Sequence, residues 1–131
     1  MKTIVTSGKR KRAVARAVLR EGKGNIKINR INFDFYEPKI ERLRIKEVVM
    51  LAGDAAKNVD IDVKINGGGF NSQAEAARLA IARAFAKFDK KLEKTFLDFD
   101  RLLLVADVRR KETHKPNRHG KARAKRQKSY R

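Results

Sequence analysis

The stretch VDIDVKINGGGFNSQAEAARLAIARAFAKF, residues 59–88, changes its hydrophobic period at three glycines. In residues 59–65 apolar and polar side chains alternate without exception, which predicts a half-buried β-strand. Gly67-Gly68-Gly69 break that strand. Beyond them, Ser72 and Glu75 have the spacing of a capping box and predict a helix start. The helix that follows is expected to bury one stripe against a sheet, and its alanines allow a close approach. That stripe consists of Ala77, Ala80, Ile81, Ala84, Phe85 and Phe88.

The segments on either side of this stretch complete a small α+β pattern. Residues 3–8 are mildly β-like, and residues 13–28 predict a β-hairpin with its turn at 21–24. After Pro38, apolar residues of 39–52 follow a helical stripe that Gly53 ends. On the other side, residues 89–96 favour a further helical turn or two, and 102–105 a buried strand. A chain of 131 residues fits one domain, which we expect to span residues 1–106.

The charge of the chain is large and unevenly distributed. The sequence has 34 Lys and Arg against 15 Asp and Glu, for a net charge of +19. Residues 1–30 hold ten basic residues and one acid, residues 31–107 hold thirteen of each, and residues 108–131 hold eleven and one. The middle is therefore neutral, and both ends carry the excess. This pattern predicts a folded body with two ends that face a polyanion, for which nucleic acid is the usual candidate and an anionic membrane the other.

Residues 107–131 have the composition of a tail. From residue 109 onward they contain no Leu, Ile, Val or Phe, and Tyr130 is their single aromatic residue. Such a segment cannot offset from a core of its own the roughly 1–2 kcal/mol that ordering each residue costs. We therefore expect an extended basic tail that is disordered alone and ordered on RNA, where Arg and Lys would contact phosphates.

Several other functions find no support in the sequence. The chain has no cysteine, which excludes disulfides and thiolate metal sites, and no apolar run of the roughly 20 residues that span a bilayer. The glycine triplet lacks the following Lys and Ser or Thr of a nucleotide-binding loop, so we interpret it as a tight turn, with contact to an RNA phosphate as the open alternative. His114 and His119 lie in the tail, and Asp60 and Asp62 lie on a strand face, without further groups for a metal or catalytic site. We predict a soluble, cytoplasmic protein that is not an enzyme and has no cofactor, metal, small-molecule substrate or membrane partner.

Three blocks of the sequence resemble a known family. Residues 8–17, GKRKRAVARA, resemble the opening signature of small-subunit ribosomal protein nine. Residues 67–76, GGGFNSQAEA, resemble the glycine-rich stretch before that family's long helix, which Ala82-Arg83-Ala84 also match. Residues 107–112 and 121–131 resemble its tail. The blocks occur in the family's order and extend from about residue 3 to the end of the chain.

The resemblance implies a fold and a set of partners. The fold would be like domain two of ribosomal protein S five, a sheet packed against helices with a left-handed βαβ crossover. The partners would be rRNA in the head of the small subunit, neighbouring ribosomal proteins and peptidyl-site tRNA. The expected rRNA-binding residues are Lys9, Arg10, Lys11, Arg12, Arg109, Arg110, Lys111, Arg118, Lys121, Arg123, Lys125 and Arg126.

The end of the tail would approach the anticodon stem-loop of the tRNA. The residues concerned are Lys128, Ser129, Tyr130 and Arg131. Their order differs from the bacterial ending and is similar to the archaeal and eukaryotic type, in which only the terminal Arg coincides with the bacterial one.

Two other hypotheses predict different behaviour. A non-ribosomal architectural nucleic-acid-binding protein would bind duplex DNA and structured rRNA equally well. A small phosphotransferase would turn over nucleotides and lose that activity on substitution of Gly68.

Overall fold

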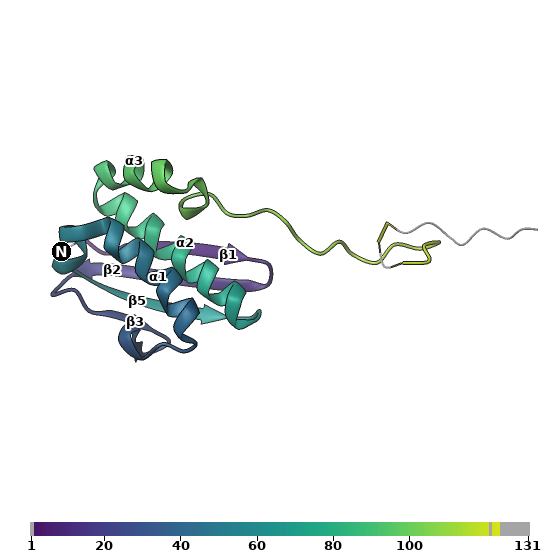
Figure 1. Ribbon diagram of the computed structural model, residues 1–131, viewed down its shortest axis with the longest axis horizontal. Helices are drawn as coiled ribbons and strands as arrows, with labels where there is room; N and C mark the ends of the chain where they lie inside the picture. The colour runs from purple at the N-terminus through teal and green to yellow at the C-terminus, as the bar shows by residue number, and fades with distance from the viewer. Residues whose placement is uncertain (1, 121, 124–131) are drawn as a thin grey trace, which may run out of the picture.

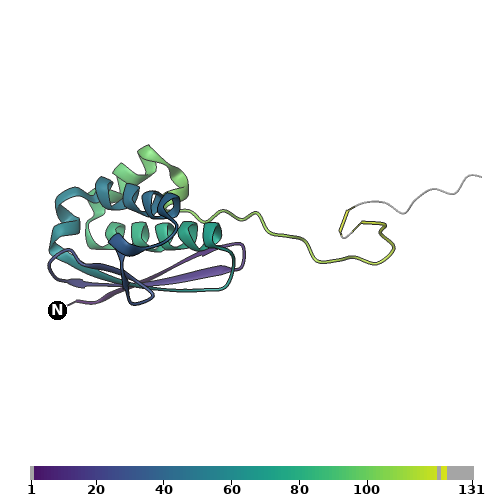
Figure 2. The same ribbon diagram turned by 60° about the horizontal axis from the view of Figure 1, so that its bottom comes forward.

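A five-stranded sheet with all its helices on one side forms the body of the protein (Figure 1). The computed structural model describes residues 2–120 and 122–123. The strands are β1 (Ile4–Arg10), β2 (Ala13–Glu21), β3 (Ile26–Ile28), β4 (Ile31–Asn32) and β5 (Val59–Asn66). The helices are α1 (Lys39–Ala52), α2 (Phe70–Phe88) and α3 (Lys90–Phe99), with 3-10 turns η1 (Phe33–Phe35), η2 (Gly53–Asn58) and η3 (Arg101–Leu103). Figure 2 shows the opposite face of the sheet bare of helices. The prediction of a single α+β domain is confirmed.

The order of the strands in the sheet is β1-β2-β5-β3-β4. β2 pairs antiparallel with β1 on one side and with β5 on the other, and β3 pairs parallel with β5. The predicted hairpin over residues 13–28 is therefore wrong, because β5 lies between β2 and β3. The longer strand takes the position beside β2. β5 pairs with β2 over eight residue pairs, from Val14↔Asn66 to Glu21↔Val59, whereas β3 has only three residues.

Helix α2 forms the centre of the core. It packs on β1 and β2, and most of its predicted stripe is buried, including Ala80, Ile81, Ala84 and Phe85. The small alanines permit a close approach at Gly8 of β1, where a Cβ atom would collide with the Ala76 carbonyl and lie 2.7 Å from the Ala80 amide. The prediction that Phe88 is buried is wrong, since 39% of it is exposed. It is the last residue of α2 and lines a groove at the rim of the core, beside Thr3.

The ends of the helices were predicted with mixed success. α1 begins after Pro38 and ends before Gly53, whose φ of 58° and amide bonds to the Val49 and Met50 carbonyls close the helix as expected. The capping box of α2 is wrong: the helix begins at Phe70 with Gly69 as its N-cap, and no side chain caps it. Ser72 lies inside the first turn. The Glu75 carboxylate is instead held by two arginines from other elements.

The segment after α2 ends the folded body. α3 confirms the helical expectation for residues 89–96, and its N-cap Asp89 accepts the Lys91 amide. The strand predicted over 102–105 is wrong. The Asp100 side chain caps a 3-10 turn by accepting the Leu102 amide, and the Leu104 carbonyl accepts a bond from Arg83 rather than from a neighbouring strand. This turn buries Leu103 fully, whereas 48% of Leu102 is exposed and Leu104 and Val105 are only partly buried.

Candidate nucleic-acid interface

The basic cluster of residues 9–12 is built into the connection between β1 and β2. Arg10 pairs with Ala13, so Lys11 and Arg12 form a two-residue turn at the tip of the hairpin. Both are exposed. Lys11 has a φ of 52°, a conformation that is uncommon for a residue other than glycine. The turn therefore projects two cations from one end of the sheet.

The glycine loop after β5 supports this turn. Gly67 and Gly68 have positive φ values of 75° and 69°. A Cβ on Gly67 would lie 2.8 Å from the Arg12 carbonyl, and one on Gly68 would lie 2.9 Å from the Cβ of Ala13. Gln73 holds the loop from α2, with its Nε2 donating to the Gly67 carbonyl over 3.0 Å. The observed role of the glycines is thus close packing against the basic turn.

Arg10 points in the other direction from Lys11 and Arg12. Its side chain is only 12% exposed, and its Nε donates to Glu75 of α2 over 2.7 Å. Nη2 lies 3.5 Å from the Asp107 carboxylate, at the point where the tail leaves the domain. Arg44 of α1 reaches the same Glu75 over 3.2 Å. We call Arg10, Glu75 and Asp107 the tail anchor, because they join β1 and α2 to the extended segment that follows η3.

Asp107 is the central acceptor at the base of the tail. Arg109 folds back onto it, with Nη2 2.7 Å from Oδ2 and its backbone amide 3.0 Å from Oδ1. These bonds, joined by the charge of Arg10, hold the pKa of the Asp107 carboxyl well below its usual range. The same pairing raises the pKa of Arg109. Asp107 is therefore ionised at neutral pH, and its bonds turn Arg109 back toward the domain.

A groove separates the hairpin turn from the start of the tail. It measures about 410 Å³ and opens between the tip of the β1–β2 hairpin and the chain just beyond the tail anchor. The residues around it are Lys11, Arg12, Arg110, Lys111, Glu112, Thr113 and His114. Four of them are cations and one is an anion, so the groove favours a negatively charged occupant such as phosphate.

The rest of the described tail leaves the body without a helix (Figure 1). Glu112 accepts bonds from Arg123 and is 3.5 Å from Lys115, and these contacts lower its pKa. Arg118 is exposed, with no salt bridge among the residues that the structure describes. The other predicted tail residues lie outside the described part of the chain. They are Lys121, Lys125 and Arg126 for rRNA, and Lys128, Ser129, Tyr130 and Arg131 for tRNA.

Comparison with known proteins identifies the family. Residues 8–131 match the model of the family described as ribosomal protein S9/S16. The chain therefore belongs to the ribosomal protein S9/S16 family. Two similar relatives are both named small ribosomal subunit protein uS9, from Methanococcus maripaludis strain C7 and strain S2. Each is 48% identical over 134 aligned positions that cover all of both chains.

Membership of the S9/S16 family makes this chain a ribosomal protein and not an enzyme. It functions in the cytoplasmic ribosome. No described helix is long and apolar enough to cross a bilayer. Within residues 2–120 and 122–123, no three His, Asp or Glu side chains are grouped as a metal site.

The sequence predictions assigned residues 9–12 and the tail to RNA binding but did not include that the structure brings them together. Residues 9–12 and the start of the tail do lie at one end of the domain. The acids that hold them, Glu75 and Asp107, were not predicted, because each is an ordinary charged residue far from Arg10 in the chain. The spacing of Lys9 and Arg10 was the available clue: if the strand continues to residue 10, they face opposite sides.

Proposed function

We propose that this chain is a structural constituent of the small ribosomal subunit and binds rRNA in the subunit head. The observation that carries the proposal is the full-length match at 48% identity to relatives named as small-subunit proteins. The charge distribution agrees with it, because a neutral body with two basic ends suits a protein embedded in folded RNA.

The geometry suggests different tasks for the predicted rRNA-binding residues. Lys11, Arg12, Arg110 and Lys111 surround one groove and would contact backbone phosphates there, Arg through its planar fork and Lys as a point charge. Arg10 and Arg109 are engaged at the tail anchor. Their task would be to fix the direction in which the tail leaves the body. This would reduce the conformational entropy that the tail loses when it binds RNA.

We further propose that residues 107–131 act as one tail, beyond a body of residues 1–106, and that its end reaches peptidyl-site tRNA. The low apolar content of the tail and its departure from the body after the anchor support this division. The role of Lys128, Ser129, Tyr130 and Arg131 rests on the family resemblance. The other partners would be the neighbouring ribosomal proteins of the head.

The fold proposed from the resemblance is that of domain two of ribosomal protein S five. Its mark would be a left-handed crossover from β3 through α1 to β5, against the usual preference of parallel strands. The parallel pairing of β3 with β5 and the position of α1 on the helix side in Figures 1 and 2 supply the βαβ unit that such a fold requires.

Sedimentation of the tagged protein from a lysate, before and after a high-salt wash, tests the ribosomal assignment. We expect the protein to stay with the small subunit through the wash. Release at moderate salt, or migration with DNA, would favour the architectural nucleic-acid-binding alternative. Deleting residues 127–131 tests the tRNA role separately: subunits should still assemble, while tRNA affinity or decoding fidelity falls. Failure of assembly would contradict that role.

A further inference from the structure

The face of the sheet that no helix covers carries a distinct set of side chains. Gly8 and Thr6 of β1 face α2, the Thr6 hydroxyl donating to the Ala80 carbonyl over 2.8 Å. Ser7 and Lys9 therefore point to the uncovered side, because neighbouring residues of a strand alternate. By the same rule, the exposed Arg16 of β2 and Lys64 of β5 point there too.

Three cations on this face are close neighbours. Arg16 of β2 lies directly opposite Lys64 of β5 in an antiparallel register, a position that brings Cβ atoms to roughly 4.5–5.5 Å. On the other side of Arg16, Ser7 is its partner in β1, so Lys9 is its diagonal neighbour. We call Lys9, Arg16 and Lys64 the open-face patch. Like charges directly opposite each other in a sheet are destabilising, so the isolated fold gains nothing from this arrangement.

The patch has no internal counter-charge. Among the residues that the structure describes, none of its three cations forms a salt bridge. The nearest acid on this face, Asp62, lies opposite Val18, so it is a diagonal neighbour of Arg16 as Lys9 is, and it too forms no salt bridge with a described residue. Asp60, near the other end of β5, accepts the amides of Lys23 and Asn25, which lower its pKa. These acids leave the three cations available to a ligand.

The open-face patch is continuous with the basic end of the molecule. Lys9 is two residues from Lys11, and Lys64 is three residues from the glycine loop that packs on Arg12. The apolar residues on this face form only a narrow stripe, with Val14 and Val18 half-buried and Val5 60% exposed. A stable protein interface needs about 800 Å² from each partner around a mostly apolar centre, which this stripe does not offer.

We propose that the uncovered face of the sheet binds backbone phosphates of rRNA through Lys9, Arg16 and Lys64. This inference rests on the proposed function and adds a second contact surface to the hairpin turn and the tail. A phosphate backbone supplies the negative charges that the patch lacks, and it would remove the repulsion between Arg16 and Lys64. The body of the protein would then be held on RNA by its sheet, and not by its ends alone.

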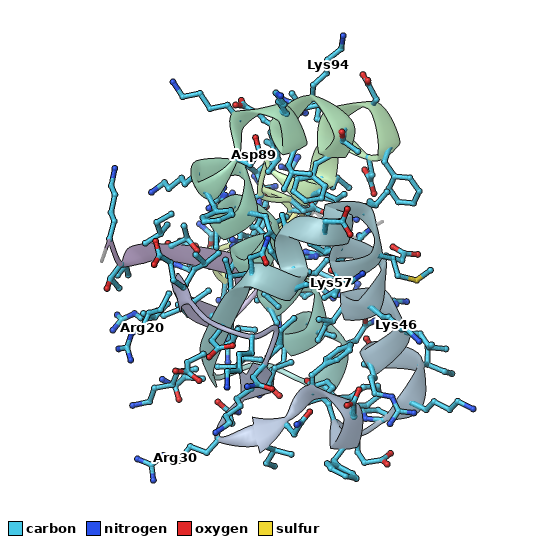
Figure 3. All side chains as sticks on the ribbon, turned by 90° about the vertical axis from the view of Figure 1, so that its left-hand side faces the viewer. Arg20, Arg30, Lys46, Lys57, Asp89 and Lys94 are labelled. Atoms are coloured by element: carbon cyan, nitrogen blue, oxygen red, sulfur yellow. The ribbon has the colours of Figure 1, made fainter. Side chains whose placement is uncertain are left out.

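A matched pair of double variants tests the proposal. Arg16→Gln/Lys64→Gln removes two charges from the open face, and Lys46→Gln/Lys94→Gln removes two from the helix side. Figure 3 shows Lys46 on α1, on the opposite side of the molecule from Arg20 of β2, and Lys94 at the top on α3, away from the sheet. Urea unfolding of each variant verifies that the fold is retained. Binding to a transcript of the small-subunit rRNA head domain is then measured from 50 to 300 mM salt.

We expect the open-face variant to bind about tenfold more weakly than the control, and the slope of log affinity against log salt to decrease by about two. Equal affinity and slope for the two double variants would overturn the proposal while leaving the proposed function intact. If the wild-type chain itself fails to bind the transcript, the proposed function fails, and this inference with it.

A photo-crosslinking residue in place of Ser7 identifies the occupant of the face directly. Ser7 is exposed beside Arg16, and its carbonyl bond to Arg83 does not involve the side chain. In assembled small subunits we expect crosslinks from this position to rRNA. Crosslinks to a protein alone would overturn the proposal and indicate an acidic protein partner for the patch.

Discussion

Arg10 and Arg16 lie on the two arms of one hairpin, six residues apart, and they have opposite environments. Arg10 is mostly buried in the tail anchor, with Glu75 and Asp107 as partners. Arg16 is exposed on the open face, opposite another cation and without an acidic partner among the described residues. Strand alternation alone separates them, because even residues of β1 and odd residues of β2 face the helices. The basic N-terminal segment therefore has a part that holds the protein together and a part that is free for a partner.

Gly8 is the position on the helix side of β1 where a substitution should have the largest effect, because α2 leaves no room for a side chain. Gly8→Val should lower the free energy of unfolding by about 3 kcal/mol or more, because the new side chain collides with the backbone of α2 at Ala76 and Ala80. The measurement is urea unfolding. Ser7→Val, one residue away on the exposed side, should change stability by less than about 0.5 kcal/mol. Similar losses in the two variants would mean that β1 does not pack on α2 as described.

The tail anchor should respond next most strongly. Arg10→Gln leaves Glu75 and Asp107 without their shared cation, and we expect it to cost about 1–2 kcal/mol of unfolding free energy. Lys11→Gln, in the exposed turn, should change it by less than about 0.5 kcal/mol. Arg10→Gln should also make the chain at residues 107–110 more sensitive to proteolysis. Equal stability of the two variants would contradict the structural role of Arg10.

The sequence predicted those elements of the fold that depend on neighbouring residues, and failed for those that depend on distant ones. β5 and α2 were predicted because their periods persist over many residues, and α1 because Pro38 and Gly53 mark its ends. The hairpin over 13–28 was wrong because alternation identifies a strand without identifying its partner. The run at 102–105 was wrong because four apolar residues fit a capped 3-10 turn as well as a strand.

The candidate site shows the same limit. The sequence predictions treated four consecutive residues as one basic unit because they are adjacent in the chain: Lys9, Arg10, Lys11 and Arg12. Their division depends on β1 extending to residue 10, on the approach of α2, and on acids 65 and 97 positions away from Arg10 in the sequence. The pairing of Arg16 with Lys64 is similarly non-local, because it depends on the register between β2 and β5.

The stability that the tail anchor provides should depend on pH. The pKa of Asp107 is depressed in the folded protein, chiefly by Arg109 and further by Arg10, so the unfolded chain takes up its proton first as the pH falls. The stabilisation from Asp107 should be complete above about pH 5 and decrease below about pH 4. We expect the difference in unfolding free energy between wild type and Asp107→Asn to shrink between pH 5 and pH 2. In an Arg109→Gln background this change should be weaker, and a difference independent of pH would contradict the ion pairing.

The smallest expected effect concerns the open-face patch and has the opposite sign. Lys64→Gln removes the like charge facing Arg16, so it should raise the free energy of unfolding by about 0.2–1 kcal/mol at low salt. The gain should vanish near 1 M salt, where the screening length is about 3 Å. Lys46→Gln on α1, which has no salt bridge among the described residues, serves as the control for net charge.

If Lys64→Gln gains no more stability than this control, the two cations do not repel each other in the free protein. If it does gain stability while rRNA binding falls, the repulsion between Arg16 and Lys64 is a cost to the isolated fold that RNA offsets, as expected where a binding surface conflicts with stability.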